Sequence, residues 1–146
     1  MNKDPNNPQN ADSKELLPNS MITLATSFGY QYDFVSSMWA QYWTSGTTIG
    51  TTPIEYFTLV GGDINRSMGP IYNRTLMDLK TIIDRNESKN YVAIAKILTA
   101  YCYQVLVDLH SDVPYSESLR ISDGILAPKY DDDISVYNQL IPLIDD

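Results

Sequence analysis

The sequence predicts an all-α fold of antiparallel helical hairpins joined by long irregular loops. Residues 89–112 are apolar on almost every side of a helix, and Lys96, Gln104 and Asp108 form one narrow polar stripe. A helix of this kind needs other helices around it. Residues 86–88 are a short break between this central helix and the amphipathic segment before it, so the two must run antiparallel as a hairpin.

A membrane span is the alternative interpretation of residues 89–112. The uncharged run from Ile97 to Val107 is only about half of the roughly 20 residues that a bilayer requires. Lys96 and Asp108 bound this run, and charges in such a segment oppose insertion. The sequence therefore favours a central helix that is buried in protein.

The chain begins with a polar stretch and continues with a helix. Residues 1–14 are rich in Asn and Pro and have no apolar period, which predicts a tether. The composition changes abruptly after it, and residues 15–146 are expected to form one helical domain. This domain opens with a long amphipathic helix, for which we expect Asn19 or Ser20 as the cap and Gly29 as the point where it kinks or divides.

Aromatic side chains crowd residues 28–43. They form either a platform on which sugar rings stack or part of the core, and their helical spacing favours the core. Residues 45–62 follow as a connection rich in Gly and Thr, and a loop of this length usually carries function. Its hydroxyls, with Tyr56 and Phe57, suit a neutral polar ligand such as a sugar. These two rings are the candidate glycan contacts, with packing beneath the loop as the alternative.

Two further helices are expected. Residues 63–84 form the first arm of the hairpin, with Asp63 or Asn65 as its cap. The carboxylates of 131–133 are expected to cap the last helix, because negative charge stabilises the amino end of a helix. The amphipathic pattern of that helix stops at Asp146 without a cap, so we expect an incomplete domain, the N-terminal half of a longer protein.

Charge and motif content exclude several classes of function. A net charge of −8 repels phosphate backbones, so nucleic-acid binding is not expected. Cys102 is the only cysteine and lies in the central helix, where a free thiol behaves as a small hydrophobe. Asp108, His110 and Asp112 resemble an acid–base or metal set, but spacings of two direct neighbours to different helix faces. We therefore expect no catalytic residue, no metal site and no cofactor.

Several motifs resemble those of the SusD/RagB family of outer-membrane lipoproteins. That family has an alanine-rich helix ending in a segment like LVDLFGDVPY, then a proline-lysine-tyrosine-aspartate turn, then a helix beginning near a valine or isoleucine and a tyrosine. The matching features are LVDLHSDVPY at 106–115, PKYD at 128–131, Val136-Tyr137, DPNNP at 4–8, LLP at 16–18 and WAQ at 39–41. His110 departs from the pattern, since the family more often has an aromatic residue there.

The resemblance implies a fold of tetratricopeptide-like hairpins and a role in nutrient uptake. Members are tethered by lipid at the surface of the outer membrane in Bacteroidetes-type bacteria. There they bind glycans, as oligo- or polysaccharides, or other nutrients for a TonB-dependent SusC-like transporter. The signal peptide and lipidated cysteine expected ahead of residue 4 are not in this sequence, and full members are longer. A helical-repeat scaffold that binds only protein partners is the alternative.

Overall fold

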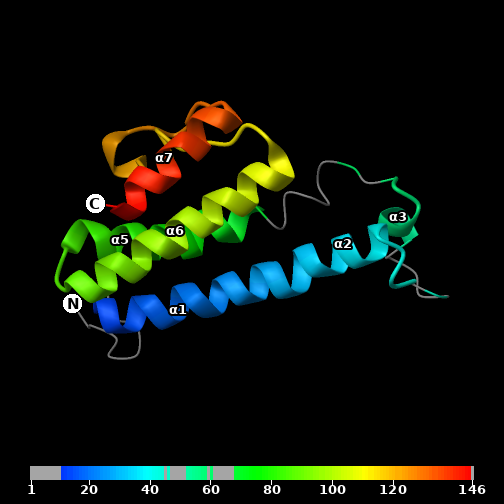
Figure 1. The fold of residues 1–146 in the computed structure, drawn as a ribbon, viewed down its shortest axis with the longest axis horizontal. Coiled ribbons are helices and arrows are strands. Elements are labelled where there is room, and N and C mark those ends of the chain that lie inside the picture. The colour runs from blue at the N-terminus through cyan, green and yellow to red at the C-terminus, as the bar shows by residue number, and fades with distance from the viewer. Residues whose placement is uncertain (1–10, 45, 47–51, 59, 61–67, 146) are drawn as a thin grey trace, which may run out of the picture.

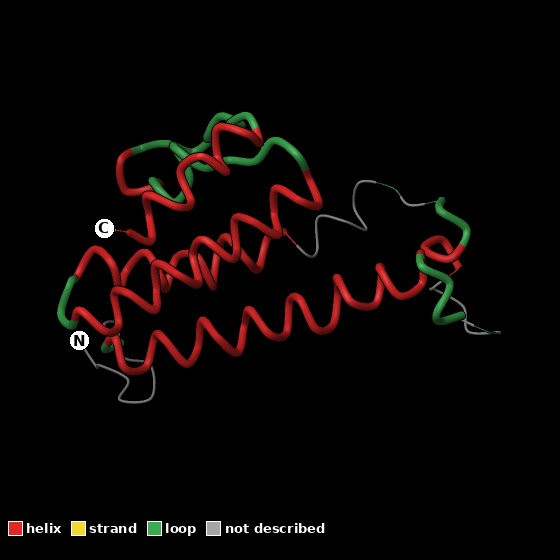
Figure 2. Tube along the Cα trace, viewed as in Figure 1, coloured by secondary structure: helices red, strands yellow, loops and turns green. Residues whose placement is uncertain are grey.

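The computed structural model describes residues 11–44, 46, 52–58, 60 and 68–145, apart from the side chains at 31, 52 and 53. The described residues form helices, turns and loops, with no strand among them (Figure 1, Figure 2), so the predicted all-α class is confirmed. The helices are α1 (Ser13–Thr26), η1 (Ser27–Tyr32), α2 (Asp33–Trp39), α3 (Thr52–Glu55), η2 (Ile71–Leu76), α5 (Met77–Arg85), α6 (Lys89–His110), η3 (Ile121–Asp123) and α7 (Asp133–Asp145).

The first three helices form one continuous rod, as the long amphipathic pattern predicts (Figure 1). The rod starts after Asp12, whose backbone N–H donates to the Glu15 carboxylate at 3.2 Å as half of a capping box. The predicted caps, Asn19 and Ser20, are wrong. Ser20 is buried inside α1, where its hydroxyl donates to the Leu17 carbonyl at 2.7 Å.

Two π-helical turns, η1 and η2, interrupt the α-helices. Gly29, the predicted break, lies in η1, and the rod continues through this wider turn. From η1, the Tyr32 hydroxyl lies 3.1 Å from His110 Nε2 at the far end of α6. The Phe28 ring meets Tyr101 edge-on at 5.4 Å. The π turn thus attaches the middle of the rod to α6.

The hairpin of α5 and α6 forms as predicted. Asn86 ends α5 in the left-handed conformation, with φ of 49°, which Asn tolerates better than most residues. α1 packs against α5 and α6, and α7 packs against the other side of α6 (Figure 1). The side chains buried between these helices are Leu17, Leu24, Ile71, Leu76, Leu79, Ile82, Ala95, Ala100, Cys102, Tyr103, Leu106, Val107, Val113, Val136 and Leu140.

The central helix α6 keeps one exposed face. Leu106 is fully buried, whereas Ile94 and Ile97 on the opposite side are 41% and 52% exposed. The prediction that helices surround α6 is therefore wrong for this face, because the described residues cover it only in part and leave these two side chains largely in water. Apolar composition alone does not reveal which sides of a helix meet a partner.

Within the described residues, α6 is also the one helix long and apolar enough to cross a membrane. Length and composition are the only basis for that statement. The central helix of a packed bundle has the same properties, and α6 carries α1, α5 and α7 on its surface.

Asp131 joins the exit of α6 to the entry of α7, an arrangement that we call the Asp131 clasp. Val113 and Asp131 form an isolated antiparallel bridge, with N···O distances of 3.2 and 3.0 Å. One Asp131 oxygen accepts the backbone N–H groups of Tyr115 and Ser116 at 3.0 and 2.7 Å, and the other accepts the Ser116 hydroxyl at 2.9 Å. Burial opposes the charged carboxylate, but these donors outweigh it and lower the pKa of Asp131.

The sequence predicts helix capping for all three carboxylates at 131–133, and the structure separates their roles. Asp132 accepts the Ser135 N–H at 3.3 Å and caps α7. Asp131 does not cap the helix; it forms the clasp. Other expectations lie outside the described residues: the caps Asp63 and Asn65, and the predicted tether except its last residues, where α1 already begins.

Candidate functional site

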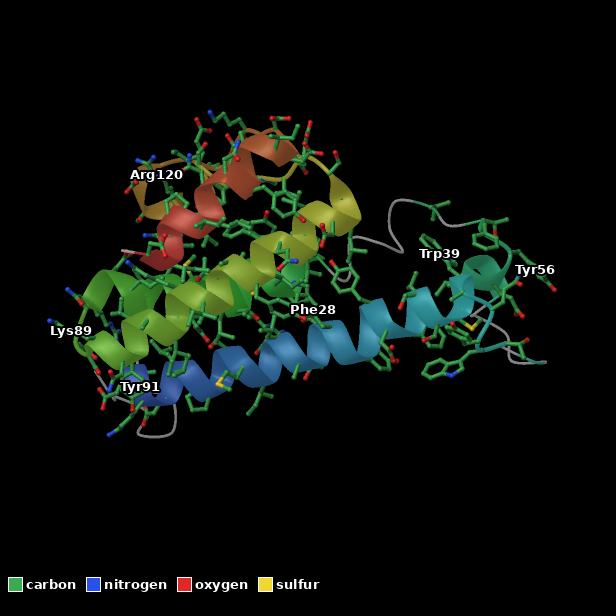
Figure 3. The ribbon with its side chains drawn as sticks, viewed as in Figure 1. Phe28, Trp39, Tyr56, Lys89, Tyr91 and Arg120 are labelled. Atoms are coloured by element: carbon green, nitrogen blue, oxygen red, sulfur yellow. The ribbon has the colours of Figure 1, made fainter. Side chains whose placement is uncertain are left out.

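The end of the rod farthest from the bundle carries five exposed aromatic residues, of which Figure 3 labels Trp39 and Tyr56. We call this group the aromatic tip: Trp39, Tyr42, Trp43, Tyr56 and Phe57. Their exposed fractions run from 42% for Trp39 to 83% for Tyr42. Large rings of this kind are usually buried, and a group of them in water marks a surface for binding.

The tip arises where α2 ends. Gln41 adopts the left-handed conformation, with φ of 61°, and its N–H donates to the Met38 carbonyl at 3.1 Å. The N–H groups of Tyr42 and Trp43 both return to the Ser37 carbonyl, at 3.0 and 3.3 Å. These bonds satisfy the last carbonyls of the helix and place both rings beyond its final turn. Met38 is only 2% exposed and supplies a small packed base, separate from the core of the bundle.

The short helix α3 is docked onto α2 by polar and aromatic contacts. The Trp39 Nε1–H donates to the Ile54 carbonyl at 3.1 Å, and the Trp39 and Phe57 ring centroids lie 5.9 Å apart, tilted by 30°. The Thr44 hydroxyl donates to Glu55 Oε1 at 2.6 Å. The two segments that carry the rings are therefore held together before any ligand arrives.

The structure places the predicted residues Tyr56 and Phe57 at the surface, 67% and 61% exposed. That they contact a ligand stays a prediction. The sequence also favours core packing for the rings of 28–43. This is right for Phe28 and Tyr32, which pack against the core, and wrong for Trp39, Tyr42 and Trp43. The sequence therefore does not identify these three as site residues, although the density of aromatic residues in 28–43 is also typical of a sugar platform.

The charge around the tip limits the chemistry of a ligand. The sequence has no lysine or arginine between Lys14 and Arg66, and Glu55 is the acidic residue of α3. The described residues of α2, α3 and their turns therefore offer no counter-charge to phosphate or carboxylate groups. Rings together with tyrosine hydroxyls and indole N–H groups suit a neutral ligand that has both apolar faces and hydroxyl groups.

The sequence-derived acid–base set is dispersed in the structure. The Tyr137 hydroxyl donates to Asp108, His110 lies against Tyr32, and Asp112 accepts the Asp133 N–H at 3.3 Å. Burial lowers the pKa of His110. Each member thus has a separate partner, which agrees with the expected structural role at the end of the helix.

The described residues contain two other groups capable of chemistry. Oxygen atoms of Asp112, Asp132 and Asp133 lie within 4.8 Å of one another, but each of these carboxylates already accepts a backbone N–H at the start of α7. Cys102 is fully buried, and burial raises the pKa of its thiol to about 12, so it is inert at neutral pH. The carboxylates are therefore already occupied and the thiol is inaccessible, which leaves the aromatic tip as the better candidate site.

Comparison with known proteins also favours a role in binding. The model of a family called SusD-like, described as starch-binding and associating with the outer membrane, matches residues 5–146. The match includes the rod, the hairpin, the Asp131 clasp and the aromatic tip. No curated protein is similar enough in sequence to be matched to the chain.

Proposed function

The chain belongs to the SusD-like family, which binds starch and associates with the outer membrane, and we propose that it is a glycan receptor whose binding surface includes the aromatic tip. The family consists of binding proteins, not enzymes. Carbohydrate binding at the outer membrane is therefore the role that membership implies, and the aromatic tip is our proposal for where it happens.

The exposure of the five rings carries the proposal. A pyranose ring has an apolar C–H face and polar edges, so it stacks on an aromatic face while its hydroxyl groups bind polar atoms at the rim. Tyr42 and Tyr56 supply hydroxyl groups, and the Trp43 indole supplies an N–H. The sequence holds no lysine or arginine between residues 15 and 65, which favours a neutral sugar.

Backbone strain at the tip supports the same location. Phe57 adopts φ of 58° and Gln41 φ of 61°, conformations that are uncommon for residues other than glycine. Strained residues of this kind concentrate at binding sites because the surrounding structure must hold them in place. Here they fix the directions in which the rings leave α2 and α3.

The family association with the outer membrane leads to a proposal about the partner and the location. The protein sits at the cell surface, held by a lipid anchor, and delivers its glycan to a TonB-dependent SusC-like transporter. The SusD/RagB motifs at 106–115 and 128–131 support this role. Co-expression with a SusC-like transporter tests it: the two proteins are expected to co-purify from detergent-solubilised outer membranes.

Affinity gels with amylopectin, and with xylan and mannan as alternatives, test glycan binding directly. The double variant Tyr56→Ala with Phe57→Ala is expected to lose about tenfold in affinity, about 1.4 kcal/mol, which is typical of removing buried aromatic anchors from an interface. Tyr30→Ala is the matched control, since Tyr30 is 70% exposed but lies on η1, away from the tip. Its affinity is expected to stay within about twofold of the parent.

The outcomes separate the alternatives. Unchanged retention in the double variant, with Tyr30→Ala weakened instead, places the glycan elsewhere on the bundle. No retention by any polysaccharide, together with co-purification of the transporter, would indicate a scaffold that binds only protein.

A further inference from the structure

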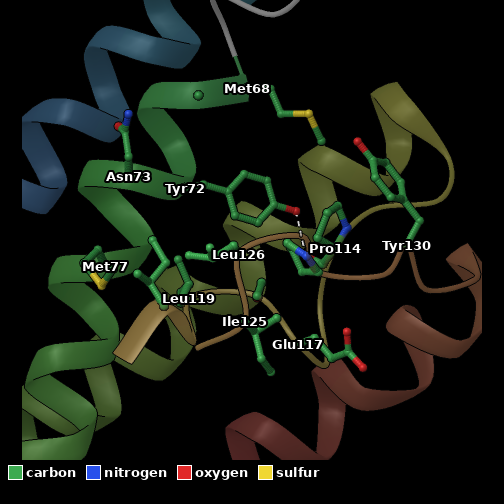
Figure 4. Close-up of a pocket in the computed structure, with 14 residues that line it drawn as sticks. Met68, Tyr72, Asn73, Met77, Pro114, Glu117, Leu119, Ile125, Leu126 and Tyr130 are labelled. Carbon is green, nitrogen blue, oxygen red and sulfur yellow. Dashed lines mark hydrogen bonds between the residues drawn. The ribbon is translucent and has the colours of Figure 1, made fainter. Parts of the chain in front are cut away.

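A cleft of about 630 Å³ lies at the bundle end, between η2 and the loop of residues 114–130 (Figure 4). None of the residues that line it belongs to the aromatic tip. We propose that this cleft binds a small, uncharged aromatic molecule, independently of the glycan surface.

The walls of the cleft are fixed by contacts within the protein. The Tyr72 hydroxyl donates to the Pro114 carbonyl at 2.8 Å, a bond that crosses from η2 to the loop (Figure 4). The Tyr72 ring is held edge-on to Tyr103 at 6.1 Å. On the loop side, the Lys129 N–H donates to Glu117 at 3.1 Å. A ligand therefore enters a site that is already formed, which reduces the entropy lost on binding.

The residues that line the cleft are mainly apolar, and several remain in water. Leu126 is 83% exposed and Ile121 is 64% exposed, and both face the same hollow as Leu119 and Ile125. Covering this surface with an apolar ligand removes it from water. The size falls within the roughly 300 to 1,000 Å³ typical of small-molecule sites.

The kinds of side chain favour an aromatic ring over an aliphatic chain. Methionine thioethers make favourable contacts with ring edges, and tyrosines pair with other rings in tilted or edge-on arrangements. The cleft offers two of each, together with two proline rings: Met68, Met77, Tyr72, Tyr130, Pro114 and Pro128.

Charge excludes the anionic members of this ligand class. Glu117 is the one residue among those lining the cleft that is charged at neutral pH, and the whole chain has a net charge of −8. A carboxylate at the site repels a second one, so aromatic acids, fatty acids and phosphate esters bind poorly. Asn73 and the Tyr130 hydroxyl remain as partners for a ligand hydroxyl group.

The probe pair 2-naphthol and 2-naphthoate tests this proposal, because the two share a ring system and differ in charge at pH 7. Methyl NMR of the whole chain is expected to show saturable binding of 2-naphthol, with shifts at Leu119 and Ile125. 2-Naphthoate is expected to bind at least tenfold more weakly. Equal binding of the two probes, or binding of 2-naphthol without shifts at Leu119 and Ile125, would overturn the proposal.

Three variants locate the site and identify the source of selectivity. Leu126→Ser is expected to weaken 2-naphthol binding at least fivefold without changing the unfolding transition, since the side chain is 83% exposed. Ile141→Ser, on an exposed side chain of α7 outside the cleft, is expected to leave the affinity within twofold. Glu117→Gln keeps an acceptor for the Lys129 N–H and is expected to reduce the preference over 2-naphthoate to less than threefold. Unchanged affinity in Leu126→Ser, or unchanged selectivity in Glu117→Gln, would contradict the assignment.

Discussion

Aromatic residues occupy two regions of this molecule, and their environments are opposite. In the bundle, Tyr103 is 3% exposed, its ring meets Tyr115 edge-on at 4.7 Å, and its hydroxyl lies 2.7 Å from Ser118 Oγ. At the aromatic tip, Tyr42 is 83% exposed and Tyr56 is 67% exposed. The same residue type stabilises the fold in one region and presents a surface in the other.

What distinguishes the two regions is whether long helices enclose the ring. α6 has α5 and α7 beside it, so rings on its inner side are enclosed. α2 continues beyond the bundle and meets mainly the short helix α3 (Figure 1). Ring burial is therefore decided by tertiary arrangement, and the two regions should respond differently to the same kind of substitution.

The largest effect on stability is expected from a core substitution in α6. Leu106 is fully buried, and Leu106→Ala should lower the free energy of unfolding by about 2 to 5 kcal/mol through lost contacts and the cavity left behind. Chemical denaturation followed by circular dichroism measures it. Ile97→Ala on the exposed face of the same helix is the control, expected to change stability by less than about 1 kcal/mol. Similar losses in both variants would mean that the exposed face of α6 is covered in solution.

A second, smaller effect is expected at the Asp131 clasp. Asp131→Asn removes a charge that accepts two backbone N–H groups and one hydroxyl, and should cost about 1 to 3 kcal/mol at pH 7. The aromatic tip, which has no contact with the clasp, should keep its tryptophan emission spectrum in this variant. A shifted spectrum would show that the two regions are coupled.

The clasp also predicts a dependence of stability on pH. The folded-state pKa of Asp131 lies below its ordinary value, so its contribution is present above the unfolded pKa and is lost as the pH falls through the folded one. Between about pH 5 and pH 3 the parent protein should lose stability more steeply than Asp131→Asn. Parallel curves for the two proteins would mean that the carboxylate is not stabilised in the fold.

The sequence predicts where the helices lie better than it predicts which elements pack against them. The period of apolar residues correctly locates the hairpin, because backbone hydrogen bonding and one apolar face suffice to define α5 and α6. The same period assigns Trp39 and Tyr42 to the core, and this is wrong because only the short helix α3 lies against α2, which leaves both rings in water. It also misses the clasp, because the distance between Asp131 and the amides of Tyr115 and Ser116 depends on how the loop folds back. For Tyr56 and Phe57, loop length and composition leave ligand contact and packing beneath the loop both open, and only the structure shows that the two rings are exposed.

A still smaller effect is expected from the hydroxyl of a buried ring. The Ser118 hydroxyl donates to the Tyr115 carbonyl at 2.8 Å, so the Tyr103 hydroxyl is the donor in its bond with Ser118. Tyr103→Phe keeps the ring and removes this bond, and should lower stability by about 1 kcal/mol. Thermal unfolding should show a modest drop in midpoint, clearly smaller than that of Leu106→Ala. A drop as large as that of Leu106→Ala would mean that the hydroxyl organises the whole loop.

The smallest effect on stability is expected at the aromatic tip itself. Tyr42→Ala removes a ring that is 83% exposed, so the free energy of unfolding should change by less than about 0.5 kcal/mol. The chain has two tryptophans, and both lie at the tip, so their fluorescence reports glycan binding there without added labels. Titration with maltoheptaose should give a saturable change in emission that Tyr42→Ala weakens. A ring that contributes to affinity but not to stability acts in binding. A loss of more than about 1 kcal/mol in Tyr42→Ala, with affinity unchanged, would instead assign the ring to the fold and end the distinction between the two regions.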